Sequence, residues 1–112
     1  MITALGFIVA AAAGSLARAE AGRRWNRSGG WPGGTLAVNV VGSFLLGLLH
    51  DVHPPVSTVL AVGGLGALTT FSSFTRDAMA LVEQRRVGLA LGYVVGTTVV
   101  SIAAAALGIA LA

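Results

Sequence analysis

Four long apolar blocks fill almost the whole of this 112-residue chain. They run from about residue 2 to 21, 34 to 49, 56 to 82 and 87 to 111, with short polar connections between them. A helix needs about 20 mostly apolar residues to cross the hydrocarbon of a bilayer. The first and fourth blocks meet that length, the second is slightly short and the third is long. The chain is therefore predicted to be an all-α membrane protein, with four transmembrane helices in a single domain over residues 1–112.

Composition supports a membrane protein and narrows its chemistry. Only 10% of the residues are charged, whereas soluble domains carry about 25%. The chain has no cysteine, which excludes disulfides and thiolate metal sites. All seven basic residues are arginine. Because arginines beside membrane spans orient a protein in the bilayer, this role is favoured over nucleic-acid binding, and no nucleic-acid partner is expected.

The third block contains an irregular stretch, Gly63–Phe74, that combines three glycines with four hydroxyl side chains. Glycine loosens the backbone, and hydroxyls can bond the groups that a broken helix leaves unpaired. At membrane depth, irregular backbone persists only where it is buried in protein or lines a wet cavity. The third helix is therefore predicted to be broken at mid-membrane, and function is expected there.

Small residues recur at four-residue spacing in two spans: Gly6, Ala10 and Gly14 in the first, and Gly88, Gly92 and Gly96 in the fourth. Such stripes let helix backbones approach closely in a membrane. They predict close packing within or between subunits. Four short helices make a poor pore alone, so a dimer is expected.

Ionisable side chains are few, and none of the four carboxylates lies at mid-span; they are Glu20, Asp51, Asp77 and Glu83. A proton-coupled transporter would need a carboxylate near the middle of the membrane. Ser72 and Ser73 have no base nearby in sequence, so the chain is not expected to be an enzyme.

Asn39 is a lone amide inside the second span. Burying an amide in hydrocarbon costs several kcal/mol unless it is hydrogen-bonded. Two interpretations are equally supported: a hydrogen bond between helices, or an N–H donor directed into a pore. Phe71 and Phe74 share a helical face, and on spacing alone they are more easily explained as packing residues.

Three motifs together resemble the Fluc (CrcB-type) fluoride channel family over nearly the whole chain. They are the run Gly34–Phe44 in span two, the run Thr69–Phe74 in span three, and the Gly-x-x-x-Arg of Gly14–Arg18. Two positions depart from the family pattern. Ser73 stands where threonine is usual and Asp77 where glutamate is common, so the hydroxyl and the charge are both kept.

The resemblance implies an antiparallel, dual-orientation dimer with two narrow pores. It assigns the fluoride pore to Asn39 as a donor, the ring edges of Phe71 and Phe74, the hydroxyls of Thr70, Ser72 and Ser73, and Thr97 or Ser101 in span four. It further implies one structural sodium ion, bound by the backbone carbonyls of Gly66 and Thr69 from each subunit. Arg18 would attract anions into the cytoplasmic vestibule, although a role in topology alone is equally supported.

The function that follows is passive export of fluoride across the inner membrane of a bacterium, which reduces fluoride toxicity. The alternative is a small antiparallel four-helix transporter for cationic drugs. That class needs a carboxylate midway along span one, and Glu20 is too near its end. A third interpretation is a non-conducting subunit whose pores depend on its partner.

Charge placement indicates which partner is needed. All seven arginines lie by the first and last connections, which face the same side of a four-span protein. The positive-inside rule then places both termini outside, in one orientation only. A homodimer of opposed copies requires nearly balanced charge. The favoured hypothesis is therefore a heterodimer with an oppositely oriented, related subunit, with the homodimer as the alternative.

Overall fold

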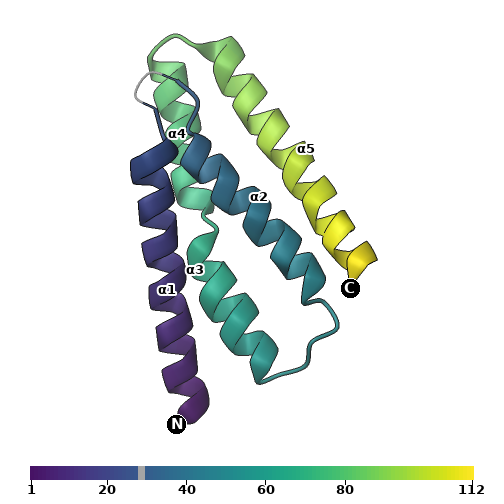
Figure 1. Ribbon diagram of the computed structural model, residues 1–112. Helices are drawn as coiled ribbons and strands as arrows, with labels where there is room; N and C mark the ends of the chain where they lie inside the picture. The colour runs from purple at the N-terminus through teal and green to yellow at the C-terminus, as the bar shows by residue number, and fades with distance from the viewer. Residues whose placement is uncertain (28–29) are drawn as a thin grey trace.

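The computed structural model describes residues 1–27 and 30–112, which run up and down as a bundle of helices (Figure 1). The elements are α1 (Ile2–Trp25), α2 (Gly33–Leu48), η1 (Thr58–Leu65), α3 (Gly66–Leu68), α4 (Phe71–Glu83) and α5 (Val87–Leu111). The three middle elements η1, α3 and α4 follow one another along a single interrupted rod. Both termini lie at the same end of the bundle, since the chain reverses direction between its successive long segments.

Three segments are long and apolar enough to cross a membrane: Ile2–Trp25, Thr58–Glu83 and Val87–Leu111. Helix α2 has only 16 residues, about 24 Å at 1.5 Å per residue. That is less than the roughly 30 Å of a bilayer core. The short second span expected from sequence is therefore short in the structure too.

Helix α1 continues to Trp25 instead of ending near residue 21. Arg23 and Arg24 lie in its last turn, where positive charge suits the negative end of the helix dipole. The arginines extend the helix beyond the apolar block. Nothing in the sequence indicated that η1 is wound as a wider π-helix.

The side chain of Asn26 ties the end of α1 to the start of α2. Its Oδ1 accepts hydrogen bonds from the backbone N–H groups of Gly34, at 2.8 Å, and Thr35, at 3.1 Å. These are two of the four N–H groups that the first turn of a helix cannot pair internally. Thr35 in turn donates its hydroxyl to Asp77 Oδ2 on α4, at 2.7 Å. One short polar chain thus joins three helices at this end of the bundle.

A close helix crossing joins α2 and α5 through two glycines. A Cβ on Gly47 would meet the carbonyl oxygen of Ala105, and a Cβ on Gly108 would meet that of Phe44. Because both contacts are with backbone, neither can be relieved by moving a side chain. Neither glycine belongs to the two predicted stripes.

The stripe predicted in α1 packs against η1 within the same chain. A Cβ on Gly6 would lie 3.5 Å from the side chain of Val59, and one on Gly14 would meet the carbonyl oxygen of Gly64. Small residues here let α1 lie close to the irregular part of the third rod, as the four-residue spacing predicts.

In the stripe in α5, a Cβ built on any of the three glycines comes within 4 Å of no other helix among residues 1–27 and 30–112. Gly88 has no atom within 4 Å of a built Cβ, while Gly92 and Gly96 face the ring of Trp31 at 3.8 and 4.0 Å. Trp31 also meets Tyr93 edge to face, with ring centroids 5.8 Å apart. Within the chain the α5 stripe therefore accommodates one tryptophan ring and leaves Gly88 open, while the predicted packing between subunits stays a prediction.

We predict that Gly108→Ala lowers the free energy of unfolding by about 1–3 kcal/mol, the usual cost of inserting a methyl into a packed contact. Gly88→Ala on the same helix is the matched control. Since its Cβ enters open space, stability should be unchanged or slightly raised. Thermal unfolding in detergent measures both variants. Equal stability in the two would contradict the crossing described above.

Candidate functional site

The third rod is interrupted at two consecutive threonines. Helix α3 ends at Leu68 and α4 begins at Phe71. Between them Thr69 (φ −76°, ψ 154°) and Thr70 (φ −152°, ψ 120°) are extended. Extended residues cannot continue the i to i−4 hydrogen bonds of a helix, so backbone groups at this point need other partners.

Asn39 on α2 supplies partners for Thr70. Its Oδ1 accepts the N–H of Thr70 at 2.8 Å, and its Nδ2 donates to the carbonyl of Thr70 at 3.1 Å. Of the two interpretations open from sequence, the hydrogen bond between helices is therefore formed. The bond uses one of the two N–H groups of the amide, which leaves the other for a ligand.

Three hydroxyls near the interruption form hydrogen bonds with backbone groups of the same chain. Thr70 Oγ1 accepts the N–H of Ser73 at 3.0 Å and so caps the start of α4. Thr69 donates its hydroxyl to the carbonyl of Leu65 at 2.9 Å, and Ser43 donates to that of Asn39 at 2.7 Å. Much of the hydroxyl content of this region therefore stabilises the interrupted backbone.

A groove of about 310 Å³ opens beside the interruption. Its lining consists of Asn39, Ser43, Leu46, Thr69, Thr70, Phe71, Phe74, Thr97, Thr98 and Ser101. Helices α2, α4 and α5 all contribute, although these residues lie far apart in sequence. None of the lining side chains carries a formal charge.

Most of the pore residues implied by the resemblance meet at this groove, but two do not. Ser72 is exposed and Ser73 is buried, with 8% of its surface accessible, and neither belongs to the lining. Successive helical residues point in different directions, so a run of hydroxyls cannot all face one groove.

Three hydroxyls on α5 are buried and have no hydrogen-bond partner: Tyr93, Thr97 and Ser101. Among the described residues they are the only buried side-chain polar atoms in that state. Their four-residue spacing aligns them on one face of the helix. An unpaired buried hydroxyl costs about 1–3 kcal/mol, so this column points to water or a ligand. Tyr93 was missed from sequence, where only the spacing of hydroxyls in span four would have indicated it.

The two phenylalanines of the third rod have different environments. Phe74 is half-buried and packs on Tyr93, with ring centroids 5.2 Å apart. Phe71 lies 6.1 Å from Phe74 between centroids, and 79% of its surface is exposed. A ring edge carries partial positive charge and can face an anion. The ring of Phe71 is thus presented outward from this chain.

Arg18 lies at the interruption as well. Its Nε donates to the carbonyl of Ala67 at 3.1 Å, in the last turn before the extended threonines. The guanidinium therefore caps the carboxyl end of α3. Within residues 1–27 and 30–112 no cluster of three or more histidine, aspartate or glutamate side chains exists to hold a metal ion. Backbone carbonyls at the interruption are among the oxygen donors that a hard cation accepts.

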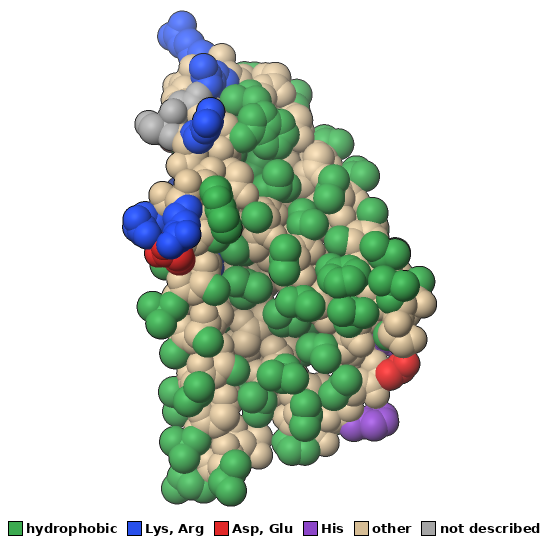
Figure 2. All heavy atoms as spheres, in the orientation of Figure 1, with side chains coloured by type: hydrophobic (Ala, Val, Ile, Leu, Met, Phe, Trp, Pro, Cys, Tyr) green, Lys and Arg blue, Asp and Glu red, His purple; other side chains and the backbone are tan. Residues whose placement is uncertain are grey.

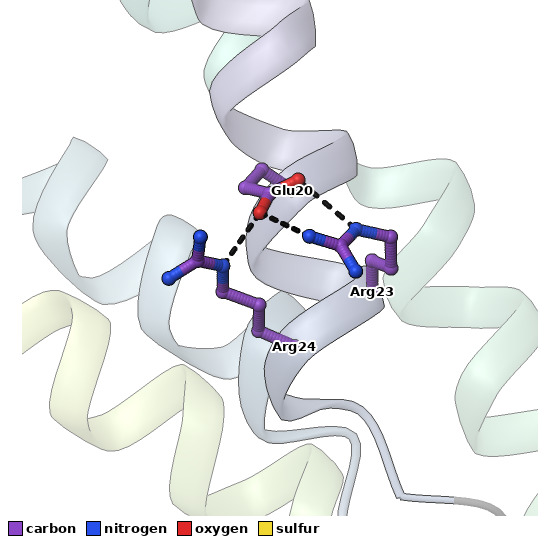
Figure 3. Close-up of polar contacts among 3 residues, drawn as sticks. All are labelled: Glu20, Arg23 and Arg24. Atoms are coloured by element: carbon purple, nitrogen blue, oxygen red, sulfur yellow. Dashed lines mark hydrogen bonds and ion pairs between the residues drawn. The ribbon is translucent and has the colours of Figure 1, made fainter.

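Positive charge gathers at one end of the bundle (Figure 2). Glu20 on α1 pairs with both Arg23 and Arg24, and all three side chains are well exposed (Figure 3). Asp51 lies at the other end, in the turn between α2 and η1, where His50 is 3.2 Å away. Exposed ion pairs of this kind contribute little to the free energy of folding. The main effect of these arginines is therefore to make this end of the bundle positively charged.

Comparison with known proteins identifies the family. The family described as "CrcB-like protein, Camphor Resistance (CrcB)" matches residues 5–109. A relative from Bordetella avium strain 197N, named "Fluoride-specific ion channel FluC", is 42% identical over 93% of this chain and 87% of its own length. A protein of the same name from Bordetella petrii is 40% identical over 95% of this chain and 88% of its own length. Another, from Phenylobacterium zucineum, is 38% identical over 90% of this chain and 87% of its own length. The chain therefore belongs to the CrcB-like family of FluC channels and is a multi-pass membrane protein, not an enzyme.

Proposed function

We propose that this chain forms a fluoride-specific channel through which fluoride leaves a bacterial cytoplasm passively. The observation that carries the proposal is the uncharged groove at the helix interruption, lined by an amide, hydroxyls and aromatic rings. Its relatives of similar length are named fluoride-specific ion channels. Residues 1–112 act as one four-helix transmembrane domain, with the interruption of the third span at membrane depth.

Fluoride holds its water tightly, so a pore needs several donors in series and no deep well that traps the ion. The free N–H of Asn39 and the unpaired hydroxyls of Thr97 and Ser101 meet that need, because none has to break an internal bond to donate. The edges of Phe71 and Phe74 complete a path of weak partial charges.

Thr70, Ser72 and Ser73 have supporting roles in this proposal. The hydroxyl of Thr70 caps α4 through its oxygen and keeps its own hydrogen for the ion. Ser72 is exposed beside Phe71, so it reaches a pore formed with a partner. Arg18 adds positive charge near the path while it caps α3.

The alternative, a small transporter for cationic drugs, lacks its carboxylate. Such a site needs an acid midway along the first span. Glu20 lies near the end of α1 and is already paired with Arg23 and Arg24 (Figure 3). A carboxylate between two arginines is a poor site for an organic cation. A non-conducting subunit is disfavoured because Asn39, Phe71 and Phe74 are all present in the groove.

The sodium ion implied by the resemblance fits the chemistry of the interruption. Hard cations prefer oxygen ligands, and unwound helix ends offer backbone carbonyls. Gly66 and Thr69 lie on the amino side of the break. Two subunits would together supply four carbonyls, and the ion would supply positive charge that stabilises both interrupted rods.

The working channel is a dimer in this proposal. The second subunit would cover the exposed ring of Phe71 beside the groove. Both termini lie at the end opposite the arginine-rich end (Figures 1 and 2). The positive-inside rule then gives one orientation with external termini, which favours a heterodimer with an oppositely oriented relative over a homodimer.

Phe71→Ile or Asn39→Asp should abolish fluoride efflux from liposomes without preventing assembly. The first removes an aromatic edge from the path, and the second replaces an amide donor by an acid. A fluoride electrode measures efflux, and size-exclusion elution reports assembly. Phe7→Ile is the matched control, since that ring packs beside Gly63 outside the groove. Unchanged efflux in both pore variants would remove the assignment.

Thr97→Val should slow fluoride efflux about tenfold and leave stability unchanged or higher. The hydroxyl has no partner in the protein, so its loss removes only a donor to the ion, worth about 1.4 kcal/mol or more. Thr98→Val is the neighbouring control, because the Thr98 hydroxyl already donates to Val94. Equal efflux in the two variants would argue against the α5 column as part of the path.

Tags placed at either terminus should be accessible only from outside the cell. The arginines gathered at the opposite end (Figure 2) fix the orientation in this proposal by the positive-inside rule. Labelling of tagged protein in intact and permeabilised cells measures this. An even mixture of orientations would refute the fixed topology and favour a homodimer.

A further inference from the structure

We propose that Asn39 and Thr70 position the sodium site, because their side chains divert the two N–H groups that would otherwise occupy its carbonyls. This inference rests on the proposed function, since it concerns the sodium ion of that channel. It gives Asn39 a second task besides donating to fluoride.

The first diverted group belongs to Thr70. In an uninterrupted α-helix the carbonyl of residue i accepts the N–H of residue i+4, which for Gly66 is that of Thr70. Here the Thr70 N–H donates to Asn39 Oδ1 at 2.8 Å instead. The carbonyl of Gly66 is thereby deprived of its usual donor and left for another partner.

The second diverted group belongs to Ser73, the i+4 partner of Thr69. Its N–H donates to Thr70 Oγ1 at 3.0 Å. Because Thr69 is also extended, with ψ 154°, its carbonyl turns away from the direction of the helix. Two side-chain acceptors, one on α2 and one at the break, thus leave two backbone oxygens without their usual donors.

Arg18 accounts for one of the two carbonyls between them. Its Nε donates to the carbonyl of Ala67 at 3.1 Å, and the positive guanidinium disfavours a cation at that oxygen. The carbonyls deprived of their helical donors by Asn39 and Thr70 are those of Gly66 and Thr69, the pair that the resemblance assigns to sodium.

Two pairs of variants separate the acceptor from the rest of each side chain. Asn39→Asp keeps an oxygen that accepts the Thr70 N–H, whereas Asn39→Leu has a similar size and no acceptor. Thr70→Ser keeps a hydroxyl oxygen for the Ser73 N–H, whereas Thr70→Val keeps the shape and loses it. In each pair the second variant removes the side-chain acceptor, so the released N–H competes with the cation for a nearby backbone carbonyl.

Sodium binding is read from thermal unfolding of the full chain, with its partner where one is required, in detergent. Sodium chloride replaces N-methyl-D-glucamine chloride at constant ionic strength, and the sodium concentration giving half of the stabilisation is measured. In Asn39→Asp and Thr70→Ser, the sodium concentration giving half of the stabilisation should lie within about threefold of the wild-type value or below it. Asn39→Leu and Thr70→Val should need about tenfold more sodium, or more, as for lost partners behind metal ligands.

Wild-type midpoints in both Asn39→Leu and Thr70→Val would overturn the inference. If one of them does not fold, the other decides. No sodium-dependent shift in the wild type would also overturn it, while fluoride efflux by the wild type would still stand as the separate test of the channel. Asn39→Asp is expected to keep the sodium response and lose fluoride efflux, which separates the two tasks of this residue.

Discussion

The Asn39 amide holds the interrupted rod together, because it hydrogen-bonds both the backbone N–H and the backbone carbonyl of Thr70. A break in a membrane helix exposes backbone groups that no water can satisfy, at several kcal/mol for each unpaired group. One amide satisfies a donor and an acceptor at once, from a neighbouring helix. Because the bond spans α2 and the third rod, it also fixes the side of the groove against which α5 packs. The interruption, the groove and the exposed ring of Phe71 all depend on it.

Polar side chains around the groove divide into those that stabilise the protein and those left for an ion. The hydroxyls of Ser43, Thr69 and Thr98 donate to carbonyls of their own helices. The hydroxyls of Thr97 and Ser101 have no partner although they are buried. A donor already in use offers little to an anion, so the second group matters more for the proposed conduction. A count of hydroxyls in the sequence cannot make this division, because it depends on which helix turn each one faces.

Apolar block lengths were enough to predict four helical segments, and the Gly63–Phe74 composition located the irregular region. The sequence could not place the interruption at two particular threonines, nor predict the π-helical winding of η1, since several hydroxyls in the run were equally able to cap a helix. It left the role of Asn39 undecided because that depends on its partner. Spacing also did not point to Gly47 on α2 and Gly108 on α5, the glycines at which these two helices meet, because only the crossing point of the helices selects them.

The groove belongs to one chain, but its chemistry is incomplete there. Phe71 meets Phe74 on one side, but 79% of its surface is exposed, so an anion passing its outer side would meet no second protein wall from this chain. In the proposed channel a bilayer cannot supply donors for the missing side, so a second wall of protein is needed. Arginines gathered at one end of the bundle oppose insertion of the same chain upside down, while the proposed two-sided site at the break needs an oppositely oriented chain. A related chain with the reverse charge bias would meet both constraints.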